Sequence, residues 1–309
     1  MRTKLILILA FFPLILLGQK QPAFKKLIKE INYYLNEYEK LSPLGDEYYP
    51  ILGFGLSSQE ITELINEADY DATLTKNKDS IQSYHMIEFF QTKIEDRIDK
   101  IVKHPDFIKN NISSLKKGGV LSIVKSDDNK LFNFSFDSKT GGTYRSRISM
   151  MYYTELINTD TSNLTPDYSI FADDGYDAIH TIQTDEGTKY VLTGNVRGCS
   201  YCFNTFVQLI KFSENEFVEE FVYSVNNRDW NDGVRYDHET KTIYVNYHID
   251  DLTPYCNCSG EINEDKFDYD KYAENETSIN CKCKFIFNGI SFELVEESWK
   301  RVKYEDRKE

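Results

Sequence analysis

Positive charge is outnumbered by negative charge in this sequence. Of its 309 residues, 36 are Lys or Arg and 50 are Asp or Glu, so that the formal net charge is -14 at pH 7. An acidic surface repels the phosphates of nucleic acids and the headgroups of anionic lipids. We therefore expect no nucleic acid among the partners of this protein and no general binding to membrane surfaces.

Long apolar runs are missing after the first 18 residues. Arg2 and Lys4 precede the apolar run Leu5–Leu17, which ends at Gly18. This order is typical of a secretory signal peptide that is cut after Gly18. A membrane anchor is the alternative, but the run falls short of the roughly 20 residues that a spanning helix needs. We predict a signal peptide at 1–18 and a secreted or periplasmic chain without a membrane span.

The motifs of common enzyme classes are missing too. We find no phosphate-binding Gly-rich loop, no Gly-x-Ser-x-Gly and no dinucleotide fingerprint. The histidines lack the short spacings of a zinc site, so we predict no metal and no cofactor. These histidines are His85, His104, His180, His238 and His248.

The segment 19–112 has the periodicity of helices. Phe24, Leu27, Ile31 and Leu35 recur at spacings of three and four, which predicts an amphipathic helix over about 22–41. Ser57 and Glu60 have the spacing of a capping box that opens a second, shorter helix. A third helix is predicted to begin near residues 79–80 and to end or kink at Pro105.

From residue 118 the apolar residues alternate with a period of two, and Asn288-Gly289 is a strong hairpin signal. We predict an α+β fold in which the helices precede an antiparallel β-meander domain at 118–309. The meander would close as a sandwich, a barrel or a small propeller, although no repeat of fixed period is visible. The predicted strands are 120–125, 131–136, 144–153, 168–172, four within 177–225, 241–249, 284–287 and 290–295. The charged tail 299–309 is expected to fray.

All six cysteines lie between positions 199 and 283, as Cys199/Cys202, Cys256/Cys258 and Cys281/Cys283. In an exported protein, an even set of paired cysteines predicts a disulfide framework rather than a zinc site. Residues i and i+2 of a strand point to the same side. Two Cys-x-Cys segments could therefore pair as Cys256–Cys283 and Cys258–Cys281 and close the acidic loop 250–283, with other connectivities open.

Carboxylates cluster at Asp173–Asp177, at Asp229–Gly233 and in the acidic loop at Glu264, Asp265, Asp268 and Asp270. Each cluster offers oxygens to calcium, but none has the spacing of a known calcium loop, and Asp-Gly is ordinary turn chemistry. Arg145 and Arg147 share one strand face, where they could clamp an anion or pair with surface carboxylates. His248 lies on the polar face of its strand, beside Tyr244.

Two functions fit these patterns. The first is a non-catalytic periplasmic or cell-surface binding protein that recognises a protein or glycan ligand with a sheet face or aromatic-rich loops. The second is a secreted hydrolase with a site near His180, His248 and Asp173–Asp177. Because no catalytic residue is specified by a motif, we favour the binding protein.

Overall fold

The computed structural model describes residues 23–43, 47–70, 80–110, 112, 115, 119–141, 146–157, 168–172, 174–198, 202–227, 232–249, 258 and 277–303. The predicted signal peptide at 1–18 lies outside these residues. Within them the chain is mixed α and β, and antiparallel strands dominate. No helix in this part of the chain is long and apolar enough to cross a membrane.

The helical part comprises α1 (Phe24–Glu39), α2 (Ser58–Tyr70) and α3 (Ser83–Val102), with a short 3-10 turn at Ile51–Gly53. A capping box opens α2. The Ser57 hydroxyl and backbone N–H both donate to the Glu60 carboxylate, and the Glu60 N–H donates to the Ser57 Oγ at 3.3 Å. A small sheet of β1 (Tyr48–Pro50) and β2 (Ser80–Gln82) lies beside these helices.

Three larger antiparallel sheets follow in chain order, each a meander of consecutive strands. The first contains β3 (Leu121–Lys125), β4 (Leu131–Asp137) and β5 (Arg147–Tyr153), after which comes the one-turn helix α4 (Thr154–Ile157). The second contains β6 (Ala178–Thr184), β7 (Gly187–Arg197), β8 (Phe203–Ser213) and β9 (Glu216–Asn227). The third contains β10 (Gly233–Asp237), β11 (Thr242–Ile249), β12 (Thr277–Phe287) and β13 (Phe292–Lys303).

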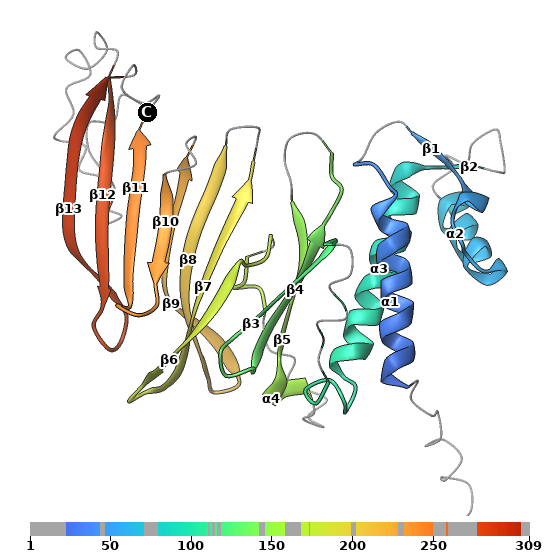
Figure 1. Cartoon of the computed structure of the whole chain (residues 1–309), viewed down its shortest axis with the longest axis horizontal. Helices are drawn as coiled ribbons and strands as arrows, with labels where there is room; N and C mark the ends of the chain where they lie inside the picture. Colours follow the sequence, from blue (N-terminus) through green and yellow to red (C-terminus); the bar gives the residue numbers. More distant parts are fainter. Residues whose placement is uncertain are drawn as a thin grey trace, which may run out of the picture.

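These sheets are arranged in a row, with the helices at one end and β13 at the other (Figure 1). Three separate clusters of buried side chains lie between the successive layers. The cluster between helices and first sheet contains Phe132 and Phe134 of β4. The next contains Tyr190 of β7, and the last contains Val191 of β7 together with Ile243 of β11. No sheet among the described residues closes into a barrel, so the barrel alternative is wrong.

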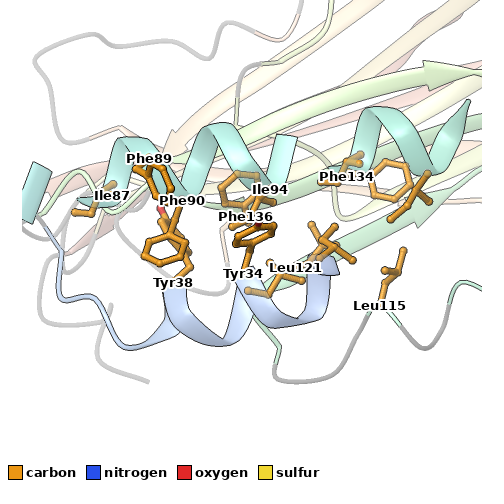
Figure 2. Packing of buried hydrophobic residues seen from close by; sticks show 14 of the residues in the cluster. Tyr34, Tyr38, Ile87, Phe89, Phe90, Ile94, Leu115, Leu121, Phe134 and Phe136 are labelled. Atoms are coloured by element: carbon orange, nitrogen blue, oxygen red, sulfur yellow. The ribbon is translucent and has the colours of Figure 1, made fainter. Parts of the chain in front are cut away.

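Aromatic side chains from α1, α3 and β4 meet in the helical cluster (Figure 2). Tyr38 and Phe136 meet edge to face, with ring centroids 5.7 Å apart. The Tyr38 hydroxyl donates to the carbonyl of Asp137 at 2.7 Å, so that this buried polar atom has a partner. Burial of these rings between helices and sheet attaches the helical part to the rest of the chain.

The middle sheet is covered on both faces, and alternate residues of β7 enter different cores. Tyr190 and Leu192 face the first sheet, whereas Val191 faces the third. Lys189 is fully buried on the latter side. Its ammonium group lies 2.8 Å from a carboxylate oxygen of Glu220 and donates to the carbonyl of Ile290 at 2.7 Å. Because Ile290 lies in the β12–β13 turn, this lysine links the second sheet to the third.

Three sequence predictions about strands need correction. Residues Tyr168–Ala172 form a turn, in which Gln208 donates to the Ile170 carbonyl and the Ala172 N–H donates to the Tyr176 hydroxyl. Side chains thus satisfy the backbone groups that a neighbouring strand would have bonded. Strand β10 is absent from the predicted strands. The tail prediction is wrong for 299–303, because β13 pairs with β12 as far as Lys303.

The hairpin at Asn288-Gly289 is confirmed, with Gly289 at φ 102° and the Asn288 side chain accepting the N–H groups of Ile290 and Ser291. The described cysteines, Cys202, Cys258, Cys281 and Cys283, are all disulfide-bonded. Cys258 pairs with Cys283, with a Cα–Cα distance of 5.7 Å. This differs from the pairing of Cys258 with Cys281 that strand geometry suggested. Cys281 and Cys283 do share one face of β12, and both are buried between the sheets.

We expect Lys189→Met to lower the free energy of unfolding by about 1.5–3 kcal/mol, because Glu220 loses the more buried of its two lysine partners and the Ile290 carbonyl loses its donor. Lys211→Met is the matched control. Lys211 contacts the other oxygen of Glu220 at 2.8 Å but is more exposed, so its loss should cost less. Urea unfolding of both variants measures the difference. Equal losses would contradict the role given to Lys189.

Candidate functional site

The outer face of the third sheet is the candidate site, because among the described residues this sheet ends the row and only its inner face packs against another layer (Figure 1). The register places Arg235 opposite Tyr244, Tyr244 opposite Lys284 and Lys284 opposite Glu296. The next rung along the strands contains Asn246 and Lys282. Since side chains of a strand alternate between faces, these residues project away from the core that contains Val245 and Cys283.

A groove with a volume of about 440 Å³ lies on this face. Polar and charged side chains supply most of its lining, which consists of Gly233, Arg235, Tyr244, Val245, Asn246, Lys282, Cys283, Lys284 and Glu296. Three of these side chains are cationic and one is anionic. The net charge of the whole chain is -14, whereas positive side chains outnumber negative ones in this groove. The groove therefore favours an anionic ligand.

Tyr244 is at the centre of this arrangement. The Arg235 guanidinium lies 5.3 Å from the centroid of its ring, and the Lys284 ammonium lies 5.9 Å from it. Both distances are within the range of cation–π attraction, which steadies long side chains that would otherwise move freely. The two cations therefore flank a partly exposed aromatic ring. This geometry offers a ligand both ionic contacts and a flat apolar surface.

A chain of hydrogen bonds fixes the end of the sheet next to the groove. Asp232 is buried and receives a hydrogen bond from His248 Nδ1 at 2.6 Å and another from the Asn246 amide at 2.8 Å. Asn280 in turn donates to Asn246 at 3.0 Å. Asp229–Gly233 has the composition of a turn, and no spacing in the sequence connects Asp232 with His248. Only the pairing of β10 with β11 brings the two together.

The structure does not bring His180 and His248 together. His180 of β6 stacks on His238, with ring centroids 4.8 Å apart, at the end of the third sheet where Asp237 pairs with Thr242. His248 lies at the other end of β11, which at about 3.3 Å per residue is roughly 20 Å away. One reacting bond cannot lie within reach of both imidazoles.

The carboxylates of Asp173–Asp177 also find partners elsewhere. Asp174 accepts the backbone N–H of Arg147 at 3.0 Å, and Asp177 lies 3.5 Å from the Arg147 guanidinium. Of the two interpretations of Arg147, pairing with carboxylates is therefore the one observed. Asp173, Arg145, Asp229 and the acidic-loop residues Glu264, Asp265, Asp268 and Asp270 lie outside the described residues.

A second hollow of about 710 Å³ lies between the segment after α3 and the β3–β4 hairpin. Phe107, Ile108 and Phe132 contribute its apolar lining, and Lys130 lies at its rim. The Lys130 ammonium forms an ion pair with Glu155. Its charge is therefore already compensated within the protein, and the hollow offers less for a charged ligand than the groove of the third sheet.

The pairing of His248 with Asp232 can be tested by two substitutions of His248. His248→Asn keeps a donor near the position of Nδ1 and should lower the free energy of unfolding by about 1 kcal/mol or less. His248→Leu leaves the buried carboxylate of Asp232 without this donor and should cost about 2–3 kcal/mol. Urea denaturation at pH 7 compares the two. A leucine variant as stable as the asparagine variant would show that the hydrogen bond contributes nothing.

Comparison with protein-family models, with curated proteins and with solved structures finds no match to this chain. Its function is therefore argued from its own residues. The features that bear on function are the basic, aromatic groove of the third sheet and the histidine pair next to the β10–β11 turn.

Proposed function

We propose that this protein is a non-catalytic, exported binding protein whose ligand is an acidic glycan, held on the outer face of the third sheet. The observation that carries this proposal is the groove in which Arg235, Lys282 and Lys284 surround the ring of Tyr244. The ligand's carboxylate or sulfate groups contact the cations, and the face of a sugar ring stacks on the tyrosine.

Charge complementarity supports an anionic ligand. The overall charge of -14 repels anions in general, so an anion gains from reaching a groove where cations predominate. Such a distribution favours specificity over indiscriminate attraction, because polyanions are rejected by most of the surface. Arginine and lysine differ in their contributions. The planar Arg235 guanidinium can bind a carboxylate through two parallel hydrogen bonds, whereas the lysines act as point charges.

The lining favours a saccharide over a peptide. Tyr244 lies on a sheet face, so its ring presents a flat surface to a flat ligand, and the Asn246 amide provides a donor and an acceptor for hydroxyl groups. A peptide that adds to a sheet needs a free strand edge. The edge strand β13 carries charged side chains at Glu296, Glu297 and Lys300, which is a usual protection of edges against such pairing.

The test uses the mature, disulfide-bonded chain and oligogalacturonate as the acidic probe. We expect binding that weakens steeply with ionic strength and a double variant, Arg235→Ala with Lys284→Ala, whose affinity is at least about tenfold lower, since each charge-assisted contact contributes about 1.5–3 kcal/mol. Isothermal titration calorimetry measures both. Lys241→Ala is the matched control: its ammonium also lies over an aromatic ring, that of Phe287, but outside the groove.

Several outcomes would count against this function. A neutral oligosaccharide of the same length that binds equally well would show that the cations do not select the ligand. Polyglutamate that binds in the same groove more tightly than oligogalacturonate would assign the groove to an acidic protein partner. An effect of Lys241→Ala as large as that of the double variant would show that charge in general, and not the groove, determines binding.

A further inference from the structure

One cluster of metal-ligating side chains joins the three larger sheets, at a place that the proposed glycan site does not use. Asp127, His180 and His238 each offer one ligand atom, and these atoms all lie within 4.8 Å of one another. Asp127 lies in the turn after β3 of the first sheet, His180 lies on β6 of the second, and His238 follows β10 of the third. His180 follows Asp127 by 53 positions, and His238 follows His180 by 58 positions. The three side chains meet only because the sheets stack.

Backbone and side-chain contacts hold the turn that carries Asp127. One oxygen of Asp127 accepts the backbone N–H of Thr181, at 2.9 Å, next to His180 in β6. The neighbouring Asp128 accepts the hydroxyl of Tyr190 at 3.0 Å. The carboxylate of Asp127 is thus aimed at β6 before any ligand binds, and its other oxygen remains available.

The two imidazoles are held side by side. Their planes differ by 17°, and the ring of Tyr236 lies 5.4 Å from that of His180. The Tyr236 hydroxyl is 3.4 Å from His238 Nδ1. Because Nδ1 of His238 contacts this hydroxyl, Nε2 is the nitrogen that is free to bind a metal. Histidine ligands are usually oriented in this way, by a hydrogen-bonding group at the nitrogen that does not bind the metal.

Burial, together with the neighbouring His238, lowers the pKa of His180 from its ordinary value, whereas Asp127 acts in the opposite direction. Burial and the charges of Asp237 and Asp127 raise the pKa of Tyr236 to about 12, so its hydroxyl keeps its proton beside the cluster.

We propose that Asp127, His180 and His238 bind one divalent transition-metal ion, with Zn²⁺ as the fitting ion, and that this ion ties the three sheets together along one edge. Two imidazole nitrogens and one carboxylate oxygen form a three-ligand set that Zn²⁺ accepts, with the fourth position left to water. Ca²⁺ and Mg²⁺ require more oxygen ligands than the cluster offers.

Metal binding requires the three ligand atoms to move slightly closer together. Zinc–ligand bonds of about 2.1 Å in a tetrahedron separate two ligand atoms by about 3.4 Å. Starting from separations of up to 4.8 Å, the side chains must therefore approach one another. His238 belongs to the β10–β11 turn, where Asp237 accepts the N–H groups of Glu239 and Thr240, so its side chain can rotate without disturbing a strand.

The test uses the full mature chain, with its disulfides intact, after removal of metals by a chelator. Titration calorimetry with Zn²⁺ should show one equivalent bound, and the melting temperature should rise with the concentration of free Zn²⁺. Co²⁺ in place of Zn²⁺ should give the visible absorption of a low-coordinate site. Mg²⁺ and Ca²⁺ should change the melting temperature by less than Zn²⁺ at the same concentration.

Two variants and one control complete the test. His238→Ala and Asp127→Asn should each weaken Zn²⁺ binding at least about tenfold and abolish the Co²⁺ signal. Asp127→Asn keeps an acceptor for the Thr181 N–H, so it retains the fold even if His238→Ala does not. His248→Asn alters a histidine that contacts one carboxylate only and should leave the stoichiometry unchanged. Unchanged Zn²⁺ affinity in Asp127→Asn, or no bound equivalent in the unmodified chain, would overturn the proposal.

Discussion

The architecture depends on the burial of both faces of the internal sheets. An antiparallel sheet usually keeps one face in water, but here the first and second sheets each lie between two other layers. Every polar group placed inside them needs a partner within the protein. Lys189 satisfies this requirement through Glu220 and the Ile290 carbonyl, and Gln208 does so through Tyr176 and the Ile170 carbonyl. These contacts also fix how neighbouring sheets are positioned.

The third sheet differs because it ends the row. Its inner face completes a core with Val191 and Val207 of the second sheet, and no described element forms a layer over its outer face. Charged side chains are tolerated there at little cost, which explains why Arg235, Lys282 and Lys284 can gather around Tyr244. The disulfide between Cys258 and Cys283 lies on the inner side of this sheet and stiffens the strand that carries two of these lysines.

The two proposed sites lie on different parts of the third sheet. The groove uses the middle of its open face, where the cations point away from the core. The metal site uses the inner edge near the β10–β11 turn, where His238 meets residues from both other large sheets. The proposals are independent, because removal of Asp127 leaves the groove unchanged and removal of Arg235 leaves the metal ligands in place.

Local chemistry in the sequence determined a good deal of this structure. The Ser57–Glu60 capping box, the Asn288-Gly289 turn and the shared face of Cys281 and Cys283 each depend on residues close in the chain, so pattern and geometry suffice to predict them. The change from a helical to a strand period near residue 118 likewise indicated the α+β class. Side chains in Tyr168–Ala172 misled the strand prediction, since their burial reflects packing between two sheets and not membership of one.

Tertiary structure alone decided where the proposed sites lie. Asp232 finds His248, and Asp127 finds His180 and His238, through strand pairing and sheet stacking, which bring together residues that no spacing rule connects. The groove required knowledge of strand register as well, because Arg235, Tyr244 and Lys284 come from three strands and share a face only when these strands are aligned. Periodicity in a sequence specifies which face of a strand is apolar. The identity of the neighbouring strand depends on long-range packing. The proposed sites depend on the same packing, because each of them combines residues from different strands.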